Sequence, residues 1–309
     1  MNSAADKTVA SMEPSVGLNA ALYPATSFQE FVALSKVRMG MLAAIMAGCG
    51  AYMASRAELN YMALLHSCVG TFLLGAGAFA LNMYLERDLD ARMERTRKRP
   101  LPAGRMAPVQ ALTFGVTVVT AGVLYLLVTC NPLTAAIGAI AAGSYVAVYT
   151  PMKRISTFNT IVGAIPGALP PVIGWAAASG RIEFGAVLMF AILFLWQLPH
   201  FLSLAWMYRD DYKKAGMAMI TSYDKDGKFT ARQTLIYGVA YVLMTLLPYQ
   251  ANMAGRLYFW TAALSGIFML GLCLRWLPNR DRKGALHIFL FSLFHLPLIY
   301  IMMVADKLS

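Results

Sequence analysis

Long apolar stretches, separated by short polar segments, account for most of the chain. Nine of them are candidate membrane spans: about 37–55, 62–84, 109–129, 132–149, 159–179, 184–206, 233–252, 257–276 and 285–304. Most reach the roughly 20 residues that an α-helix needs to cross the hydrocarbon layer. A backbone in lipid must satisfy its own hydrogen bonds, so these stretches should be helical. The pattern predicts an all-α integral membrane protein with nine transmembrane helices.

The composition supports this class of protein. Hydrophobic residues make up 59% of the 309 residues and charged residues only 13%, and the mean hydropathy is +0.57. A soluble domain would not carry so many long apolar stretches. The four cysteines are scattered through the apolar spans without a paired spacing. We therefore expect them to be small buried side chains rather than metal ligands or disulfide partners.

Lys and Arg are distributed very unevenly between the two ends of the predicted helices. With nine spans, one side holds the N-terminal segment as far as Arg38 and the loops near 85–108, 150–158, 207–232 and 275–284. That side carries all of the 26 basic residues except Arg56, Arg181, Arg256 and Lys307. Because basic residues accumulate in cytoplasmic loops, the N-terminus and the charged loops are predicted to be cytoplasmic. The net charge of +11 is then mainly a topology signal, with contact to anionic lipids of the bilayer as a second effect.

The sequence also predicts the domain organisation and excludes one class of partner. Residues 1–30 are rich in Ala and Ser and resemble a flexible N-terminal tail, and residues 31–309 are expected to form a single transmembrane domain. The tail has neither the pattern of a signal peptide nor that of a mitochondrial transit peptide, which favours a bacterial inner (plasma) membrane. Nucleic-acid binding is not expected, because the chain has no soluble basic domain.

The end of the second span carries an unusual concentration of charge. Residues 82–102 contain four acidic side chains among a run of Arg and Lys. Asn82, Glu86 and Asp90 follow one another at intervals of four, so they share one face of a helix. Amide and carboxylate oxygens suit a hard divalent cation such as Mg²⁺, and the basic run suits an anion. Together they predict a site for a metal-bound phosphate ester at the membrane surface.

A second acidic helix end follows four spans later. The sixth span ends in segment 206–216, where Asp210 and Asp211 are candidates for a second set of metal ligands. A diphosphate leaving group, neutralised by metal and by Arg or Lys, would leave behind an allylic cation that an electron-rich acceptor attacks. A dry site would shield this cation from water. The competing interpretation of residues 86–99 is a solvated loop whose charges only set the topology.

These segments resemble a known family. Asn82-x-x-x-Glu86-x-x-x-Asp90, followed by Arg95-Thr96-x-x-Arg99-Pro100-Leu101, resembles the first signature of the UbiA superfamily of intramembrane prenyltransferases. The middle acid, Glu86, resembles the protoheme IX farnesyltransferase (haem O synthase) branch, whereas the quinone branches usually carry Asp there. Further matching segments are Tyr149-Thr150-x-x-Lys153-Arg154, Pro170-Pro171-x-Ile173-Gly174-Trp175, Trp196-x-x-Pro199-His200-Phe201 and Asp210-Asp211-Tyr212-x-x-Ala215-Gly216. The resemblance implies a fold of nine helices around a central cavity, with extramembrane caps over its cytoplasmic mouth.

The resemblance also implies a reaction and its site. The farnesyl group of farnesyl diphosphate would be transferred to a vinyl group of haem B to give haem O, with haem A synthase or terminal oxidase assembly proteins as partners. Mg²⁺ would bridge the diphosphate to Asn82, Glu86 and Asp90, and Asp211, beside Asp210, would supply a ligand from the second cluster. The residues implied in substrate binding are Arg95, Arg99, Lys153 and Arg154, with Tyr149, Tyr212, Lys214, Lys36 and Arg38 as further candidates.

Two positions depart from the family pattern, and one histidine has two interpretations. Other UbiA branches have Asp-x-x-x-Asp as their second signature, but the corresponding residues here are Tyr208 and Tyr212. Which acid of the second cluster meets a metal is therefore open. Val37 stands where the branch commonly has Pro, which affects only the start of the first span. His200 is either a hydrogen-bonded structural residue or, because imidazole is a common haem ligand, a residue that contacts haem.

Two other functions compete with this reaction. The first is a UbiA-type prenyltransferase acting on an aromatic or quinone precursor, against which Glu86 and the Pro-His-Phe segment argue. The second is a multi-span transporter, which would place charged groups at mid-membrane depth. Here the acids gather at one end of the helices instead.

Overall fold

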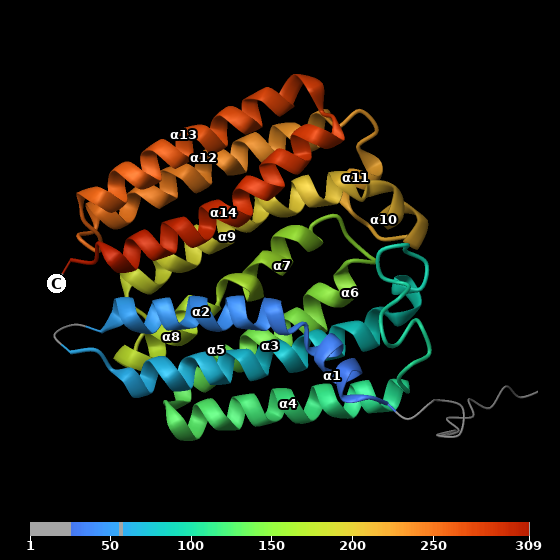
Figure 1. Ribbon diagram of the computed structural model, residues 1–309, viewed down its shortest axis with the longest axis horizontal. Coiled ribbons are helices and arrows are strands. Elements are labelled where there is room, and N and C mark those ends of the chain that lie inside the picture. The colour runs from blue at the N-terminus through green and yellow to red at the C-terminus, as the bar shows by residue number, and fades with distance from the viewer. Residues whose placement is uncertain (1–25, 56–57, 309) are drawn as a thin grey trace, which may run out of the picture.

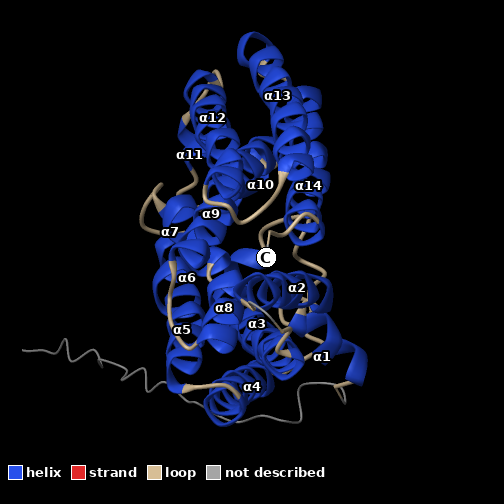
Figure 2. Ribbon diagram, turned by 90° about the vertical axis from the view of Figure 1, so that its left-hand side faces the viewer, coloured by secondary structure: helices blue, strands red, loops and turns tan. Residues whose placement is uncertain are grey.

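Eight long apolar helical segments dominate the computed structural model, which describes residues 26–55 and 58–308. Each is long and apolar enough to cross a membrane: Val37–Ala54 (α2), Tyr61–Asp90 (α3), Pro108–Thr129 (α4), Pro132–Met152 (α5, η2 and α6), Asn159–Ser179 (α7 and α8), Phe184–Met207 (α9), Arg256–Asn279 (α13) and Arg282–Ala305 (α14). These bounds agree within a few residues with eight of the nine predicted spans, except that α3 runs six residues further. The chain is therefore a multi-pass membrane protein, and the described residues contain no β-strand beyond one isolated bridge, Ala254 to Lys307 (Figure 2).

The ninth predicted span, 233–252, lies in α12 (Lys228–Gln250), a helix of 23 residues. Its three tyrosines, three threonines and two glutamines lower its hydropathy, so that it is less apolar than the eight segments above. It packs lengthwise between α9 and α13 (Figure 1). The count of nine spans is thus confirmed for eight, and the ninth is a long helix of more mixed character.

The long helices form two halves that lie side by side in Figure 1. One half contains α9, α12, α13 and α14, and the other contains α2, α3, α4, α5 and α8. Contacts of α9 with α7, α8 and α2, and of α14 with α2, join the halves. The largest cluster of buried hydrophobic side chains lies across this junction.

Close backbone approach between α2 and α8 depends on glycine. A Cβ atom added to Gly174 would lie 1.7 Å from the carbonyl oxygen of Ala47, and one added to Gly50 would lie 2.0 Å from that of Pro171. Small residues of this kind are typical of helix pairs in membranes, where close packing takes the place of hydrophobic burial. Gly50 and Gly174 thus allow α2 and α8 to approach at backbone contact.

Two of the membrane segments depart from regular α-helix. Segment 159–179 is divided at Leu169 into α7 (Asn159–Ala168) and α8 (Pro170–Ser179), because Pro170 has no backbone N–H to continue the first helix. Segment 132–152 contains a π-helical stretch, η2 (Ser144–Tyr149), between α5 (Pro132–Gly143) and α6 (Thr150–Met152). π-Helical turns are rare and occur often at functional sites.

Short helices and loops gather at one end of the bundle. They are α1 (Phe28–Ser35), α10 (Arg209–Ala215), α11 (Ile220–Tyr223) and the irregular segment 91–107, on the right of Figure 1. The predicted tail, 1–30, lies outside the described residues as far as residue 25, and its last three residues are already part of α1. The C-terminal end of α3 belongs to this same end of the molecule.

Candidate active site

The predicted metal-binding face exists and is buried. Helix α3 continues to Asp90, so that Asn82, Glu86 and Asp90 all lie on its last turns. Their exposed fractions are 1%, 3% and 1%. After the helix ends, the Thr96 hydroxyl donates a hydrogen bond of 2.8 Å to the Asp90 carbonyl oxygen and folds the following segment back over it. The interpretation of residues 86–99 as a purely solvated loop is therefore wrong for these two acids.

Each buried carboxylate has one basic partner, which comes from a distant part of the sequence for Glu86 and from the segment just after α3 for Asp90. Lys153 Nζ lies 2.8 Å from Glu86 Oε1 and donates a hydrogen bond of 3.1 Å to Oε2. Arg99 Nη1 donates a hydrogen bond of 2.6 Å to Asp90 Oδ2. Burying a charge without a partner is costly, so these pairs explain how two carboxylates are kept inside the protein. The structure thus brings together four of the residues predicted from sequence.

Asn82 is oriented by a residue that the sequence analysis did not single out as a site residue. Its Nδ2 donates a hydrogen bond of 3.1 Å to the hydroxyl of Thr150, which donates in turn to the carbonyl oxygen of Tyr145 at 2.9 Å. The amide nitrogen is therefore engaged on the side of η2, and Oδ1 faces Lys36, whose Nζ is 3.5 Å away. Thr150 lies three residues before Lys153, on the same helical face, which is the signal that could have identified it.

Lys36 enters the site through an unusual backbone conformation. It separates α1 from α2 with φ 44° and ψ 52°, in the left-handed region that few non-glycine residues adopt. Its Nζ lies 5.2 Å from the centre of the Phe79 ring. Burial, reinforced by the nearby charges of Arg99 and Lys153, lowers the pKa of Lys36 to about 7. The sequence had marked it only as a weaker candidate.

The environment of Lys153, unlike that of Lys36, favours the charged form of the side chain. Its Nζ lies 4.6 Å from the centre of the Tyr149 ring. Burial opposes its charge, but Tyr149 and the Glu86 carboxylate outweigh that effect and raise the pKa of Lys153. The Tyr149 ring needs Gly163, because a Cβ at that position would lie 2.4 Å from a ring carbon. Lys153 is therefore a fixed positive charge at the mouth of the site.

The oxygen atoms of the α3 face fit a divalent cation such as Mg²⁺. Asp90 Oδ1 is buried and has no hydrogen-bond partner among the described residues, and Glu86 Oε1 meets Lys153 only as an ion pair. Native proteins rarely leave buried acceptors unused. In the described part of the chain no group of three or more His, Cys, Asp or Glu side chains could hold a metal. Two carboxylates and one amide are the oxygen donors that this face offers, and Mg²⁺ commonly completes such a set with phosphate oxygens and water.

Among the described residues, Asp210 and Asp211 share no hydrogen bond or ion pair with Asn82, Glu86 or Asp90. Asp210 is on the first turn of α10, where its side chain is 85% exposed and 3.9 Å from Arg209 Nε. Asp211 is half-buried. Arg95 provides the polar link between the two segments: it donates a hydrogen bond of 3.4 Å to the Tyr212 hydroxyl and lies 5.2 Å from the Tyr208 ring. Leu89 and Met93 also share a hydrophobic cluster with Ala215 of α10.

The other predicted substrate-binding residues lie further out. Arg154 Nη2 donates a hydrogen bond of 3.0 Å to the carbonyl oxygen of Leu85, at the edge of the site. Arg38 on the first turn of α2 and Lys214 on α10 are exposed, and neither side chain has a polar partner among residues 26–55 and 58–308. These two are therefore not part of the buried cluster.

His200 is a packed side chain between α9 and α14. Its Nδ1 is 2.7 Å from the Ser292 hydroxyl, and its ring stacks on Trp196 and Phe289 with centroids 4.6 and 4.7 Å apart. This is the environment of a buried, hydrogen-bonded histidine. With Nδ1 engaged, only Nε2 remains for any further contact.

Comparisons with known proteins give matches over most of the chain. Residues 41–295 match the model of the UbiA prenyltransferase family. A protoheme IX farnesyltransferase of Solibacter usitatus is 42% identical over 288 residues, covering 90% of this chain and 99% of that protein. One of Koribacter versatilis is 37% identical over 293 residues, covering 92% and 94%.

Solved structures with the same fold are more distant in sequence. A digeranylgeranylglyceryl phosphate synthase superposes with a TM-score of 0.76 at 18% identity, covering 90% of this chain and 97% of that one. A UbiA homologue from Archaeoglobus fulgidus, bound to DMAPP and Mg²⁺, gives a TM-score of 0.61 at 13% identity, covering 88% and 99%. These likenesses support the fold described above.

Proposed function

This chain belongs to the UbiA prenyltransferase family, and on that premise we propose that it is a protoheme IX farnesyltransferase. It transfers the farnesyl group of farnesyl diphosphate to a vinyl group of haem B and so produces haem O. The observation that carries the proposal is the buried face of Asn82, Glu86 and Asp90, opposed by Lys153 and Arg99. Such a site combines oxygen ligands for a cation with positive charge for a diphosphate.

Binding of the diphosphate exchanges partners within the site. Without it, Lys153 and Arg99 neutralise Glu86 and Asp90. A Mg²⁺ ion held by Asn82, Glu86 and Asp90 would supply Lewis-acid stabilisation of the leaving diphosphate. Lys153 and Arg99 then donate hydrogen bonds to phosphate oxygens, and Lys36, Arg95 and Arg154 add positive charge around them. The two cations that neutralise Glu86 and Asp90 in the unliganded site thus become partners of the phosphate oxygens, while the metal takes over the carboxylates.

The chemical step breaks the bond between C1 of the farnesyl group and the bridging phosphate oxygen, and the electron pair leaves with the diphosphate. The vinyl group of haem B attacks C1 through its π electrons. Water then adds to the resulting side-chain cation and loses a proton, which gives the hydroxyethylfarnesyl group. The protein's contribution is electrostatic, because fixed cations and ligands face the charge that develops on the leaving group.

The choice of haem as acceptor rests on the relatives and on two sequence features. The relatives named above are protoheme IX farnesyltransferases. Glu86 is the middle acid of the first signature, and His200 belongs to the Pro-His-Phe segment. We assign His200 a contact with haem, through Nε2, as a part of this proposal. Asp210 and Asp211, with Tyr212 and Lys214, remain candidates for a second metal and for diphosphate contacts from α10.

The location of the site follows from the charge distribution. The Lys- and Arg-rich ends of the helices, including the site, would face the cytoplasm of a bacterium, and the chain would reside in its inner membrane. Farnesyl diphosphate then reaches the site from the cytoplasmic side. Haem A synthase and terminal oxidase assembly proteins are the partners that would receive the product.

The proposal is tested by product analysis. The purified protein is incubated in detergent with haem B, farnesyl diphosphate and Mg²⁺, and the haem fraction is analysed by mass spectrometry. We expect haem O with Mg²⁺ and none after chelation by EDTA. A folded protein that makes no haem O but prenylates 4-hydroxybenzoate would replace the acceptor in this proposal with an aromatic precursor.

A further inference from the structure

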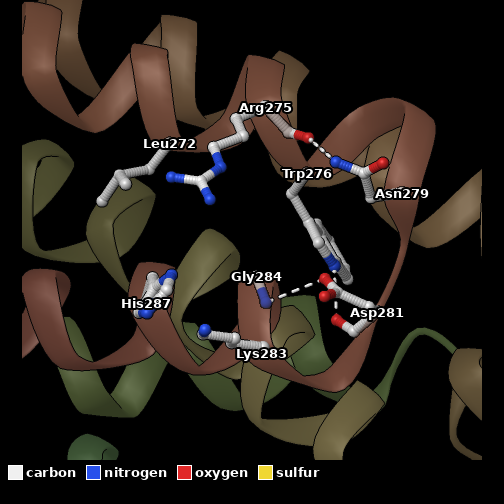
Figure 3. A pocket seen from close by; sticks show the side chains of 8 residues that line it. All are labelled: Leu272, Arg275, Trp276, Asn279, Asp281, Lys283, Gly284 and His287. Atoms are coloured by element: carbon white, nitrogen blue, oxygen red, sulfur yellow. Dashed lines mark hydrogen bonds between the residues drawn. The ribbon is translucent and has the colours of Figure 1, made fainter.

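A small pocket at the α13–α14 turn lies outside the site described above. It is lined by Leu272, Arg275, Trp276, Asn279, Asp281, Lys283, Gly284 and His287. Figure 3 shows the Arg275, Lys283 and His287 side chains around the same hollow, the first from α13 and the other two from successive turns of α14. The basic side chains of Arg275, Lys283 and His287, from two helices, thus face one space.

The basic side chains of this pocket have no ion-pair partner in the described part of the protein. Neither Arg275 nor Lys283 forms an ion pair with another described residue, and the His287 ring makes no hydrogen bond within the same part of the chain. The one carboxylate in the lining, Asp281, is engaged as the N-cap of α14, where its Oδ1 accepts the Gly284 N–H at 2.9 Å. The start of α14 adds the positive end of its helix dipole.

The walls of the pocket are built rigidly. Trp276 Nε1 donates a hydrogen bond of 2.9 Å to the Asp281 carbonyl oxygen. A Cβ on Gly284 would lie 2.4 Å from the Trp276 ring, so only glycine lets α14 start directly against the indole. Trp206, at the end of α9, packs edge-on against Trp276 and donates to the Arg280 carbonyl oxygen at 2.9 Å.

The pocket lies at the ends of helices whose outer faces are apolar, which is the order of the headgroup and hydrocarbon layers of a bilayer. The pocket lies at the end of the bundle that carries α10 and α11 (Figure 1). Away from the turn, the outer faces of α13 and α14 expose large apolar side chains, among them Leu274, Phe268, Leu290 and Phe294. A molecule with a phosphate at Arg275 and Lys283 and hydrocarbon chains along these faces would satisfy both features.

We propose that the pocket binds the phosphate headgroup of an anionic phospholipid, with Arg275 and Lys283 as its charge partners and His287 as a third contact. Basic pockets between transmembrane helices recognise such headgroups by this combination of charge and depth. The acyl chains lie on the apolar faces of α13 and α14. The proposal is independent of the reaction assigned to the α3 site.

The test is native mass spectrometry of the full chain in detergent, with phosphatidylglycerol titrated against phosphatidylcholine. We expect selective binding of phosphatidylglycerol, and about a twenty-fivefold loss of affinity in Arg275→Gln/Lys283→Gln, at about fivefold for each basic residue. The matched control is Arg282→Gln/Lys225→Gln, which removes two exposed charges outside the pocket. This control should retain the wild-type affinity.

Two results would overturn the proposal. The first is an equal loss in both double variants, which would reduce the effect to general surface charge. The second is inorganic phosphate competing with the lipid at equal concentration, which would make the pocket a site for free anions. If the double variant does not fold, the exposed single change Arg275→Gln, compared with Arg282→Gln, decides the same question.

Discussion

Arg99 Nη1 is 2.6 Å from Oδ2 of Asp90, while Oδ1 of the same buried carboxylate has no hydrogen-bond partner among the described residues. One oxygen is thus neutralised by the protein and the other is left for a ligand. This division of one carboxylate between a fixed cation and an open position is what the proposed diphosphate chemistry needs.

The first prediction concerns that open oxygen. Asp90→Asn keeps the shape of the side chain but removes the charge that faces the cation, so we expect turnover to fall by about 10²–10³, as for the loss of one preorganised electrostatic group. Arg99 is 22% exposed and can turn to water, so the fold should persist. Haem O formation measured by mass spectrometry, with circular dichroism as the control, checks this. Full activity would remove residue 90 from the metal site.

The second prediction separates stability from catalysis at Glu86. Lys153→Met leaves a buried carboxylate without its partner, which should cost about 3–5 kcal/mol of unfolding free energy. The double variant Lys153→Met/Glu86→Gln removes both charges and should recover most of that loss while remaining inactive. Thermal unfolding of the three proteins measures the difference. If the double variant is no more stable than Lys153→Met, the unpaired Glu86 carboxylate is not the cause of the lost unfolding free energy.

The third prediction concerns the orientation of Asn82. Thr150→Val removes the hydroxyl that accepts from Asn82 Nδ2 and should raise the Mg²⁺ concentration needed for half-maximal activity about 10–100-fold, as for other partners of metal ligands. Thr150→Ser should restore it. Thr234→Val on α12, which also removes a buried hydroxyl, is the matched control. Equal Mg²⁺ dependence in Thr150→Val and the wild type would contradict the role.

The fourth prediction concerns helix packing. Gly174→Ala would place a methyl group 1.7 Å from the Ala47 carbonyl oxygen, and such overpacking should destabilise the protein by about 1–3 kcal/mol or more. Gly271, on α13, has nothing within 4 Å of an added Cβ. Gly271→Ala should therefore be neutral or raise stability by about 0.5–1 kcal/mol through helix propensity. Gly174→Ala should therefore lower the melting temperature, whereas Gly271→Ala should leave it unchanged or raise it.

The fifth prediction concerns His200. Its Nδ1 is engaged by Ser292, so if Nε2 meets haem, His200→Ala should weaken haem binding and shift the Soret absorption. His295→Ala, which removes another buried histidine bonded to a serine, serves as the control and should leave the spectrum unchanged. An unaltered affinity and spectrum in His200→Ala would assign the residue to packing between α9 and α14.

Much of the fold was predictable because it depends on local hydropathy. Eight of the spans and the shared face of Asn82, Glu86 and Asp90 follow from length and from spacing along one helix. The weaker hydropathy of α12 was harder to interpret, since its polar residues occur within an otherwise apolar sequence.

The partners within the site could not be predicted from the residues alone. Lys153 reaches Glu86 across 67 positions of sequence, and its approach depends on how α6 meets α3, which no local pattern encodes. The same holds for Thr150 and for the left-handed Lys36. In the sequence, the acids at 210 and 211 follow an apolar span just as those at 86 and 90 do, yet Asp210 is exposed. Residue type and spacing do not reveal depth of burial.

The π-helical stretch η2 has a consequence for how this protein tolerates small changes in length. Each residue removed from a helix turns all that follows by about 100°. A π-helical turn closes its hydrogen bonds from residue i to i+5 and so holds one residue more than an α-helical turn. Deleting one residue between Ser144 and Tyr149 would therefore let this stretch continue as α-helix, with Thr150 and Lys153 still facing α3. The same deletion in α5 would leave the hydropathy profile and the number of spans as they are, but it would turn Thr150 and Lys153 away from α3.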